Sequence, residues 1–500
     1  MADAGSALEL SLPHDAVAAL RRRPQFVRRA GGGRGSTAAL VWYDTPEGAL
    51  AASGLALCER RIGAETVWRL ERLRGGAERP WPPGTPPPLL AQAASPAELG
   101  HALPAPLLPV AAFAGRARPL PLADAAPDLR ATLLLGTLRA VVGERGCCRL
   151  LLDGPAEALE RLALSLAAAV PLSAPDTSLA AEAYATAGRA VPPRAHGAPD
   201  LPSGLSVEAA FSHAVAHLSG VLLHWAPLAA AGATPEPVHQ MRVALRRLRS
   251  VISLFRAALG GPDLDAANAE LGALSQVLGP ARDWDVFCAG TGAAIAAGFP
   301  GDRAVARLLA AAQKQRLAGY AALRAHLAAP AFRLLGIRLA CLAALQPWQR
   351  AAATDEAAAA KQASLRAAPL AEYAGRALGR RLARVQQPGA EFADLPIEAL
   401  HALRIQSKRL RYAAEVFAPL FPRKETRKFL RRIGALQERL GHLNDGAVAE
   451  ALMAQLQRGG AERALAIGVV RGFVAAGMRG ARAKGARSWR RFCRLEAFWE

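Results

Sequence analysis

Two segments of the chain carry basic side chains at spacings that place them on one side of a helix. The first is VHQMRVALRRLR (238–249), and its basic residues recur every three or four positions: His239, Arg242, Arg246 and Arg249. At 100° per residue they share one side, and apolar residues occupy the other. Like charges at these spacings repel by about a few tenths of a kcal/mol per pair. Folding gains nothing from this arrangement, whereas a bound polyanion would offset the repulsion.

The same pattern returns 162 residues later, in LHALRIQSKRLR (400–411). The equivalent basic residues are His401, Arg404, Lys408 and Arg411. The register holds without a gap for roughly 45 residues and makes Asp445 equivalent to Asp283, as expected of two copies of one helical unit. A single basic helix face is usually only solvated, but its repetition favours a binding surface. The two aspartates are expected to cap helices or orient arginines rather than to catalyse.

Positive charge is concentrated in the later part of the chain. Of the net charge of +21, residues 1–200 carry +2 and residues 201–500 carry +19. A field of this sign attracts polyanions such as nucleic acid, anionic lipid or phosphate polymers. Only six of the 62 cations are lysine, and arginine is the better bidentate ligand for phosphate.

The chain is predicted to fold as an α+β protein of two domains. Residues 1–200 contain alternating, β-branched segments typical of antiparallel strands, and a Pro- and Gly-rich linker (191–204) coincides with the change in charge. Residues 201–500 have the helical period throughout, in two repeats of about 205–360 and 361–500.

Several classes of protein and site are not expected. No uncharged apolar run reaches the roughly 18 residues of a membrane helix, and the start has no signal-peptide pattern, so no membrane partner is predicted. The six cysteines form no C-x-x-C motif, which argues against a metal site or a disulfide framework and favours the cytoplasm. The basic tail RGARAKGARSWRRFCR (479–494) is expected to be a solvated surface.

The two H-x-x-R-[VI]-x-x-[RK]-R-x-R helices, each followed 44 residues after its histidine by an aspartate in an L-G-x-x-x-D context, resemble the CHAD domain over about 205–500. The resemblance implies two helical bundles related by a pseudo-two-fold axis. It also implies that their basic stripes face each other across a groove that binds inorganic polyphosphate. The implied ligands are His239, Arg242, Arg246, Arg249, His401, Arg404, Lys408 and Arg411, with Arg247 and Arg409 further round the helices.

The N-terminal part resembles a CYTH (triphosphate tunnel) domain in YDTPEGALAASGLAL (43–57) and PVAAFAGRARPLPL (109–122). That resemblance implies an antiparallel β tunnel, whose active members bind triphosphate with inward basic residues and a divalent metal with inward carboxylates. This chain has Ala7 and Ser11 in the opening E-x-E-x-K pattern, and RGCCRLLLDG replaces the late acidic strand. The tunnel is therefore expected to be degenerate and without catalytic residues. Its remnant site would be Glu9, Arg60, Arg116 and Arg118.

Polyphosphate binding, with docking on cytoplasmic polyphosphate granules, is the function that these resemblances favour, and it needs no cofactor. The alternative is a metal-dependent inorganic triphosphatase to which the CHAD domain delivers substrate; only then would a divalent metal be needed. Non-specific nucleic-acid binding is a third hypothesis, although the stripes carry no interleaved aromatic residues on which bases could stack. The sequence leaves the oligomeric state open.

Overall fold

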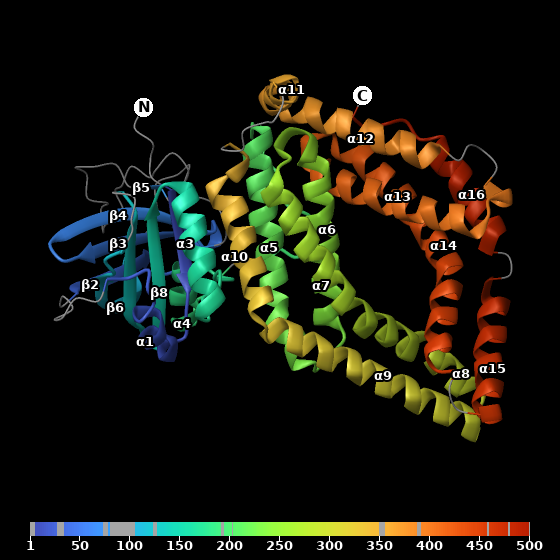
Figure 1. Ribbon diagram of the computed structural model, residues 1–500. Coiled ribbons are helices and arrows are strands. Elements are labelled where there is room, and N and C mark those ends of the chain that lie inside the picture. The colour runs from blue at the N-terminus through green and yellow to red at the C-terminus, as the bar shows by residue number, and fades with distance from the viewer. Residues whose placement is uncertain are drawn as a thin grey trace. The chain divides into compact units, whose positions relative to one another are not determined.

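The computed structural model separates the chain into two compact units (Figure 1). Unit 1 comprises Met1–His196, Val215–Leu223 and Ala329–Gln349; unit 2 comprises Gly197–Ala214, His224–Ala328 and Arg350–Glu500. The units therefore do not divide at a single point of the chain. The structure describes residues 6–27, 35–73, 79–80, 106–123, 128–191, 195–202, 204–349, 356–387, 392–457, 460–478 and 481–499.

Unit 1 is built on an antiparallel eight-stranded sheet with the order β1-β8-β7-β6-β2-β3-β4-β5. The sheet curls into a half-barrel, and between the described parts of its edge strands β1 and β5 no pairing is present. The antiparallel sheet expected in the N-terminal part is confirmed. Its strands are β1 (Ser6–Ser11), β2 (Ser36–Asp44), β3 (Leu55–Ile62), β4 (Glu65–Arg72), β5 (Arg79–Pro80), β6 (Leu108–Pro119), β7 (Arg130–Ala140) and β8 (Gly143–Gly154).

Each face of this sheet buries its own apolar core, because successive side chains along a strand point to opposite faces. One face includes Trp42 and Phe113 and is covered by α4 (Leu179–Thr186). The other includes Leu133 and Leu150 and is covered by α3 (Ala156–Ala169) and by α10 (Pro330–Leu345). Unit 1 thus uses a helix from far along the chain. Its short helical elements are η1 (His14–Ala16), α1 (Val17–Arg21), α2 (Ala49–Ala52) and η3 (Pro347–Gln349).

Unit 2 is helical throughout its described part, as the periodicity predicts. Helix α5 (Val207–Ala231) contributes residues to both units. The other elements of unit 2 are α6 (Glu236–Leu259), α7 (Pro262–Phe287), the π-helical η2 (Cys288–Gly292), α8 (Ala293–Gly298), α9 (Arg303–Ala328), α11 (Glu356–Ala367), α12 (Leu370–Gln386), η4 (Phe392–Asp394), α13 (Ile397–Phe417), η5 (Ala418–Leu420), α14 (Arg423–Gln455), α15 (Gly460–Met478) and α16 (Ala481–Cys493).

The core of unit 2 is centred on Phe255 of α6. Its ring lies 5.5 Å from those of Phe211 and Tyr373 and 5.8 Å from that of Phe417 on α13. Phe255 and Phe417 occupy equivalent positions in the internal repeat. Equivalent residues contact each other only close to a two-fold axis, so this pair marks where the two copies meet.

The C-terminal tail is more than the solvated surface expected from its arginines. Helix α16 buries Trp489 and Phe492, each 1% exposed, and leaves Arg490 exposed. Phe492 and the following Phe498 pack edge-on against Phe429 of α14. The expectation is therefore wrong for the aromatic residues of the tail, because Phe492 packs against Phe429 and Trp489 packs against Phe392, both far earlier in the chain.

Among the described residues, α5 is long and apolar enough to cross a membrane. The number rises to three if the bent pair α9 and α10 and the bent pair α15 and α16 are each counted as one span. This assessment uses only the length and composition of the helices. The expectation that no uncharged apolar run reaches the length of a membrane helix is wrong for α5, because residues 209–231 contain no Asp, Glu, Lys or Arg and are interrupted only by scattered polar residues such as His and Ser. In the structure 44% of its most apolar window is buried inside the protein, as in a helix that packs in a core.

We predict that Trp489→Ala lowers the free energy of unfolding of unit 2 by about 3 to 5 kcal/mol, because it removes a fully buried aromatic side chain. Urea unfolding of the full chain measures this loss. Arg490→Ala, next to it and exposed, is the matched control and should cost less than about 0.5 kcal/mol. Equal costs for the two variants would mean that the tail does not contribute to the core.

Candidate functional site

The predicted basic residues of the first copy lie on α6, outside its buried face. The helix begins with Glu236 and Pro237 in its first turn, where an acidic residue and proline are both favourable. Its apolar residues Met241, Leu245, Leu248, Ile252 and Phe255 are buried, which confirms the predicted amphipathic face. His239, Arg242, Arg246 and Arg247 are partly buried and Arg249 is exposed.

Helix α13 repeats this arrangement and packs against α6. Its buried apolar residues include Leu403, Leu410 and Phe417. Contact between the two helices brings the basic residues of both copies into one unit, although the expected central groove stays a prediction. Of the predicted residues on α13, Arg404, Lys408 and Arg411 are partly buried, and His401 and Arg409 are exposed.

A single carboxylate links the two basic helices. Glu415 of α13 accepts a bond of 3.1 Å from Nη2 of Arg247 on α6 and one of 2.8 Å from Nε of Arg411, four residues before it. The Arg247 and Glu415 side chains are each only 14% exposed. Removing either partner of such a pair strands a charge away from water, at a cost of about 3 to 5 kcal/mol. Arg247 and Arg411 are therefore held in position before any ligand binds.

An aromatic ring holds a second arginine of α6. The guanidinium carbon of Arg246 lies 5.9 Å from the centre of the Tyr412 ring on α13, within the range of a cation–π contact. Nε of Arg246 is buried and has no hydrogen-bond partner in the part of the chain that the structure describes. The face of Tyr412 thus compensates in part for the water that this guanidinium has lost.

Helix α7 supplies partners for the remaining arginines of the first copy. Asp283 Oδ1 lies 3.8 Å from Nη2 of Arg242, an ion pair too long for a hydrogen bond, and Arg249 Nε donates to Asn268 at 3.2 Å. Asp283 lies inside α7, so it orients an arginine and does not cap the helix. The side chain of Asp445 lies outside the described residues.

Two glycines at equivalent positions lie beside the arginines. A Cβ added at Gly272 would lie 3.9 Å from Nη2 of Arg249, and one at Gly434 would lie 3.8 Å from Nη1 of Arg411. Both pairs have the 162-residue offset of the repeat. Sequence reasoning missed these glycines, although the repeat register passes through them and could have found them.

The histidine of the first copy is surrounded by positive charge. Burial lowers the pKa of His239 below its usual range, and Arg282 of α7 lowers it further; Glu236 opposes this effect, and Arg246 and Arg242 add to it. Burial also lowers the pKa of Arg242, against the opposing effect of Asp283. His239 is therefore mainly neutral at pH 7 in the free protein. Arg282 had no signal in the sequence, because its proximity depends on how α7 packs.

The four predicted remnant residues of the tunnel are divided between the two faces of the sheet. In the strand register, Glu9 and Arg60 share the face that includes Trp42 and Phe113. Arg116 and Arg118 of β6 point to the opposite face, because antiparallel partners lie on the same side and neighbours alternate. The structure thus does not bring these four side chains together.

Glu9 is held by an arginine in unit 1. Arg149 is 3% exposed and donates to Oε1 of Glu9 at 2.8 Å, to Oε1 of Glu182 at 2.7 Å and to Oγ of Ser11 at 2.9 Å. This pairing neutralises the carboxylate that a divalent metal would need. Within the described ranges no three His, Cys, Asp or Glu side chains gather as metal ligands, so the donors present do not fit a metal site.

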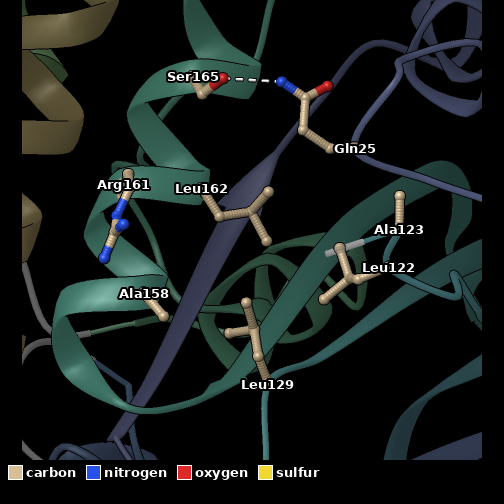
Figure 2. A pocket seen from close by; sticks show the side chains of 8 residues that line it. All are labelled: Gln25, Leu122, Ala123, Leu129, Ala158, Arg161, Leu162 and Ser165. Carbon is tan, nitrogen blue, oxygen red and sulfur yellow. Dashed lines mark hydrogen bonds between the residues drawn. The ribbon is translucent and has the colours of Figure 1, made fainter. Parts of the chain in front are cut away.

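A pocket of about 380 Å³ lies beside α3 in unit 1 (Figure 2). Its lining is largely apolar, with Leu122, Leu129 and Leu162. At one side Gln25 donates to the hydroxyl of Ser165 at 2.7 Å. Arg161, also in the lining, forms an ion pair with Glu157 on the same helix. The residues that line the pocket form no acid–base pair or activated nucleophile, so the pocket gives no sign of catalysis.

Comparison with known proteins identifies the helical part of the chain. The model of the CHAD domain family matches residues 208–454. The crystal structure of the CHAD domain from the plant Ricinus communis is 28% identical, with a TM-score of 0.50, and the match covers 61% of this chain and 98% of that one. PptA from Streptomyces chartreusis is 18% identical, with a TM-score of 0.42, over 57% of this chain and 100% of that one.

None of the curated proteins matches the chain. The family match begins at residue 208 and does not extend to the sheet of unit 1. It includes both basic helices, α6 and α13, and the helices α7 and α14 that pack against them. The chain therefore contains a CHAD domain, which spans residues 208–454.

Proposed function

We propose that unit 2 binds inorganic polyphosphate through the basic faces of α6 and α13, because CHAD domains are associated with binding of this polymer. The observation that carries the proposal is the contact between α6 and α13, which joins two copies of one basic pattern in a single unit. A polymer with a negative charge at every repeat suits a surface on which cations recur in this way. The proposed ligands are the ten residues named for the two stripes.

The chemistry of this proposal is non-covalent. Guanidinium groups bind phosphoryl oxygens through paired N–H donors, and such charge-assisted bonds are about twice as strong as neutral ones. Arg247 and Arg411 are fixed by Glu415, and Arg246 is fixed by Tyr412. Side chains that are already ordered lose little conformational entropy when the polymer binds. Docking of the protein on cytoplasmic polyphosphate granules would follow from such binding.

Polyphosphate suits this surface better than nucleic acid does. The aromatic ring of Tyr412, which lies beside the basic residues, is engaged by Arg246, whereas proteins that bind single strands offer aromatic faces to the bases. Binding of RNA would thus depend on the phosphates alone. Both ligands would be released by salt, but polyphosphate would bind more tightly than RNA of matched charge.

We also propose that the sheet of unit 1 is a degenerate CYTH-like domain without hydrolytic activity. The supporting observation is that Arg149 pairs with Glu9, the glutamate that remains from the metal-binding pattern, and also with Glu182. Apolar side chains such as Trp42 and Phe113 fill the same face of the sheet. A metal-dependent triphosphatase would need free carboxylates at this place.

Reversing one charge in each stripe should abolish polyphosphate binding. Each charge-assisted bond is worth about 1.5 to 3 kcal/mol, so the double variant Arg246→Glu with Lys408→Glu should weaken binding on the order of 100-fold or more. The matched control is Lys314→Glu with Lys361→Glu, which makes the same change in net charge at exposed positions on α9 and α11. Titrations with long-chain polyphosphate measure both. Equal affinities for the two variants would refute the stripe assignment.

Binding should strengthen as the pH falls. A polyanion beside His239 favours the imidazolium, so binding raises the lowered pKa of this side chain and takes up a proton. Affinity measured from about pH 8 to about pH 5.5 should therefore rise as the pH falls below the raised pKa of the complex, and should level off below the pKa of the free protein. His239→Gln should flatten this dependence. A pH profile that the substitution leaves unchanged would exclude His239 from the ligand set.

Tripolyphosphate should not be hydrolysed by the full chain. We expect no release of phosphate with Mg²⁺ or Mn²⁺ above the level without metal, because Glu9 is paired with Arg149. A colorimetric phosphate assay tests this, with Glu9→Ala as the companion variant. Metal-dependent release that Glu9→Ala eliminates would instead establish the triphosphatase.

A further inference from the structure

Ser253 and Glu415 are equivalent positions of the two repeat copies, and they differ in charge. The arginine of the first copy and its equivalent in the second copy each define a contact between α6 and α13. In the first contact, Arg247 of α6 pairs with Glu415 of α13. In the repeat register, Arg409 is equivalent to Arg247, and Ser253 of α6 is equivalent to Glu415. The second contact therefore has a hydroxyl where the first has a carboxylate.

A buried arginine lies at this second contact. Arg381 of α12 is 9% exposed, and its Nη2 donates to the hydroxyl of Ser253 at 3.2 Å. It forms no ion pair within the described part of the chain, where ion pairs have been found for other arginines of the unit. A guanidinium removed from water without a negative partner is strongly unfavourable.

The charged groups that act most strongly on Arg381 are three further arginines. Burial, followed by the positive charges of Arg409, Arg384 and Arg380 in that order, lowers the pKa of Arg381 to about 10. All three are exposed, and α12 packs directly against α13 (Figure 1). Arg380 and Arg384 lie on the same helix as Arg381, and Arg409 lies on the neighbouring helix α13, so an ion from solvent could approach these exposed side chains.

We propose that Arg381, with Arg409, Arg380 and Arg384, binds one phosphoryl group at a subsite of the second copy. The bound oxyanion would neutralise arginine charge in the second copy as the Glu415 carboxylate does in the first copy. In the first copy Glu415 itself pairs with Arg247, so no anion from solution is needed there. The inference rests on the proposed function for the identity of the anion. The phosphoryl group is supplied either by free orthophosphate or by a unit of the polyphosphate chain.

Ser253→Glu is the decisive variant, because it places a carboxylate where the repeat has Glu415 and should close the subsite. In the full chain without phosphate it should raise the unfolding temperature of unit 2, because Arg381 gains a partner. It should also eliminate the rise in unfolding temperature that orthophosphate produces in the unsubstituted protein. Arg381→Gln should likewise eliminate this rise. Arg376→Gln, on the same helix and paired with Glu372, is the control and should retain it at equal ionic strength.

Polyphosphate titrations distinguish the two sources of the phosphoryl group. If the polymer supplies it, Ser253→Glu should weaken polyphosphate binding about tenfold, whether or not orthophosphate shifts the unfolding temperature. If free orthophosphate supplies it, the thermal shift should depend on Arg381 while polyphosphate affinity stays unchanged. The subsite is refuted if Ser253→Glu changes neither the orthophosphate shift nor the polyphosphate affinity.

The stripe variant separates the failure of this inference from the failure of the proposed function. Loss of polyphosphate binding in Arg246→Glu with Lys408→Glu, together with unchanged behaviour of Ser253→Glu, would support the stripes and overturn the subsite. Normal polyphosphate binding in the stripe variant, together with the expected changes in Ser253→Glu, would support the subsite and overturn the stripe assignment.

Discussion

Repulsion among guanidinium groups is the constraint that the packing of α6 against α13 has to meet. The two helices share a buried apolar contact at Phe255 and Phe417, and that contact draws their arginines together in a region with little water. Glu415 neutralises part of this charge, and Tyr412 offers a π face to another part. One carboxylate and one aromatic ring do not balance the charge of all the arginines near them. The positive charge that remains is stabilised best by an anion from solution.

The two copies of the repeat share their packing more closely than their electrostatics. Phe255 and Phe417 contact each other at equivalent positions, and Gly272 and Gly434 each lie beside an arginine of the neighbouring helix. Charge neutralisation, by contrast, differs between the copies. A repeat of this kind keeps the shape of a symmetric surface while its two halves can bind different parts of one ligand.

Local periodicity explains why much of the fold and of the basic surface could be predicted. The buried face of α6 follows directly from the helical spacing of its apolar residues, and the antiparallel strands follow from alternation. Contacts between distant segments could not be predicted in this way. Arg149 reaches Glu9 across 140 positions of the chain, and α10 joins the core of unit 1 from beyond residue 329. Glu415 lies four residues after Arg411, so the spacing rule for helices could have found that pair.

The aromatic residues at the end of the chain have a consequence for the biosynthesis of the protein. Trp499 packs against Phe429, and a Cβ added at Gly375 would lie 3.5 Å from its backbone oxygen. Helices α12 and α14 therefore complete their packing only after Trp499 has left the ribosome. The sheet of unit 1 faces a similar delay, because α10 covers it and is translated long after β8. Both units thus expose apolar surface on the nascent chain, where chaperones would be expected to bind.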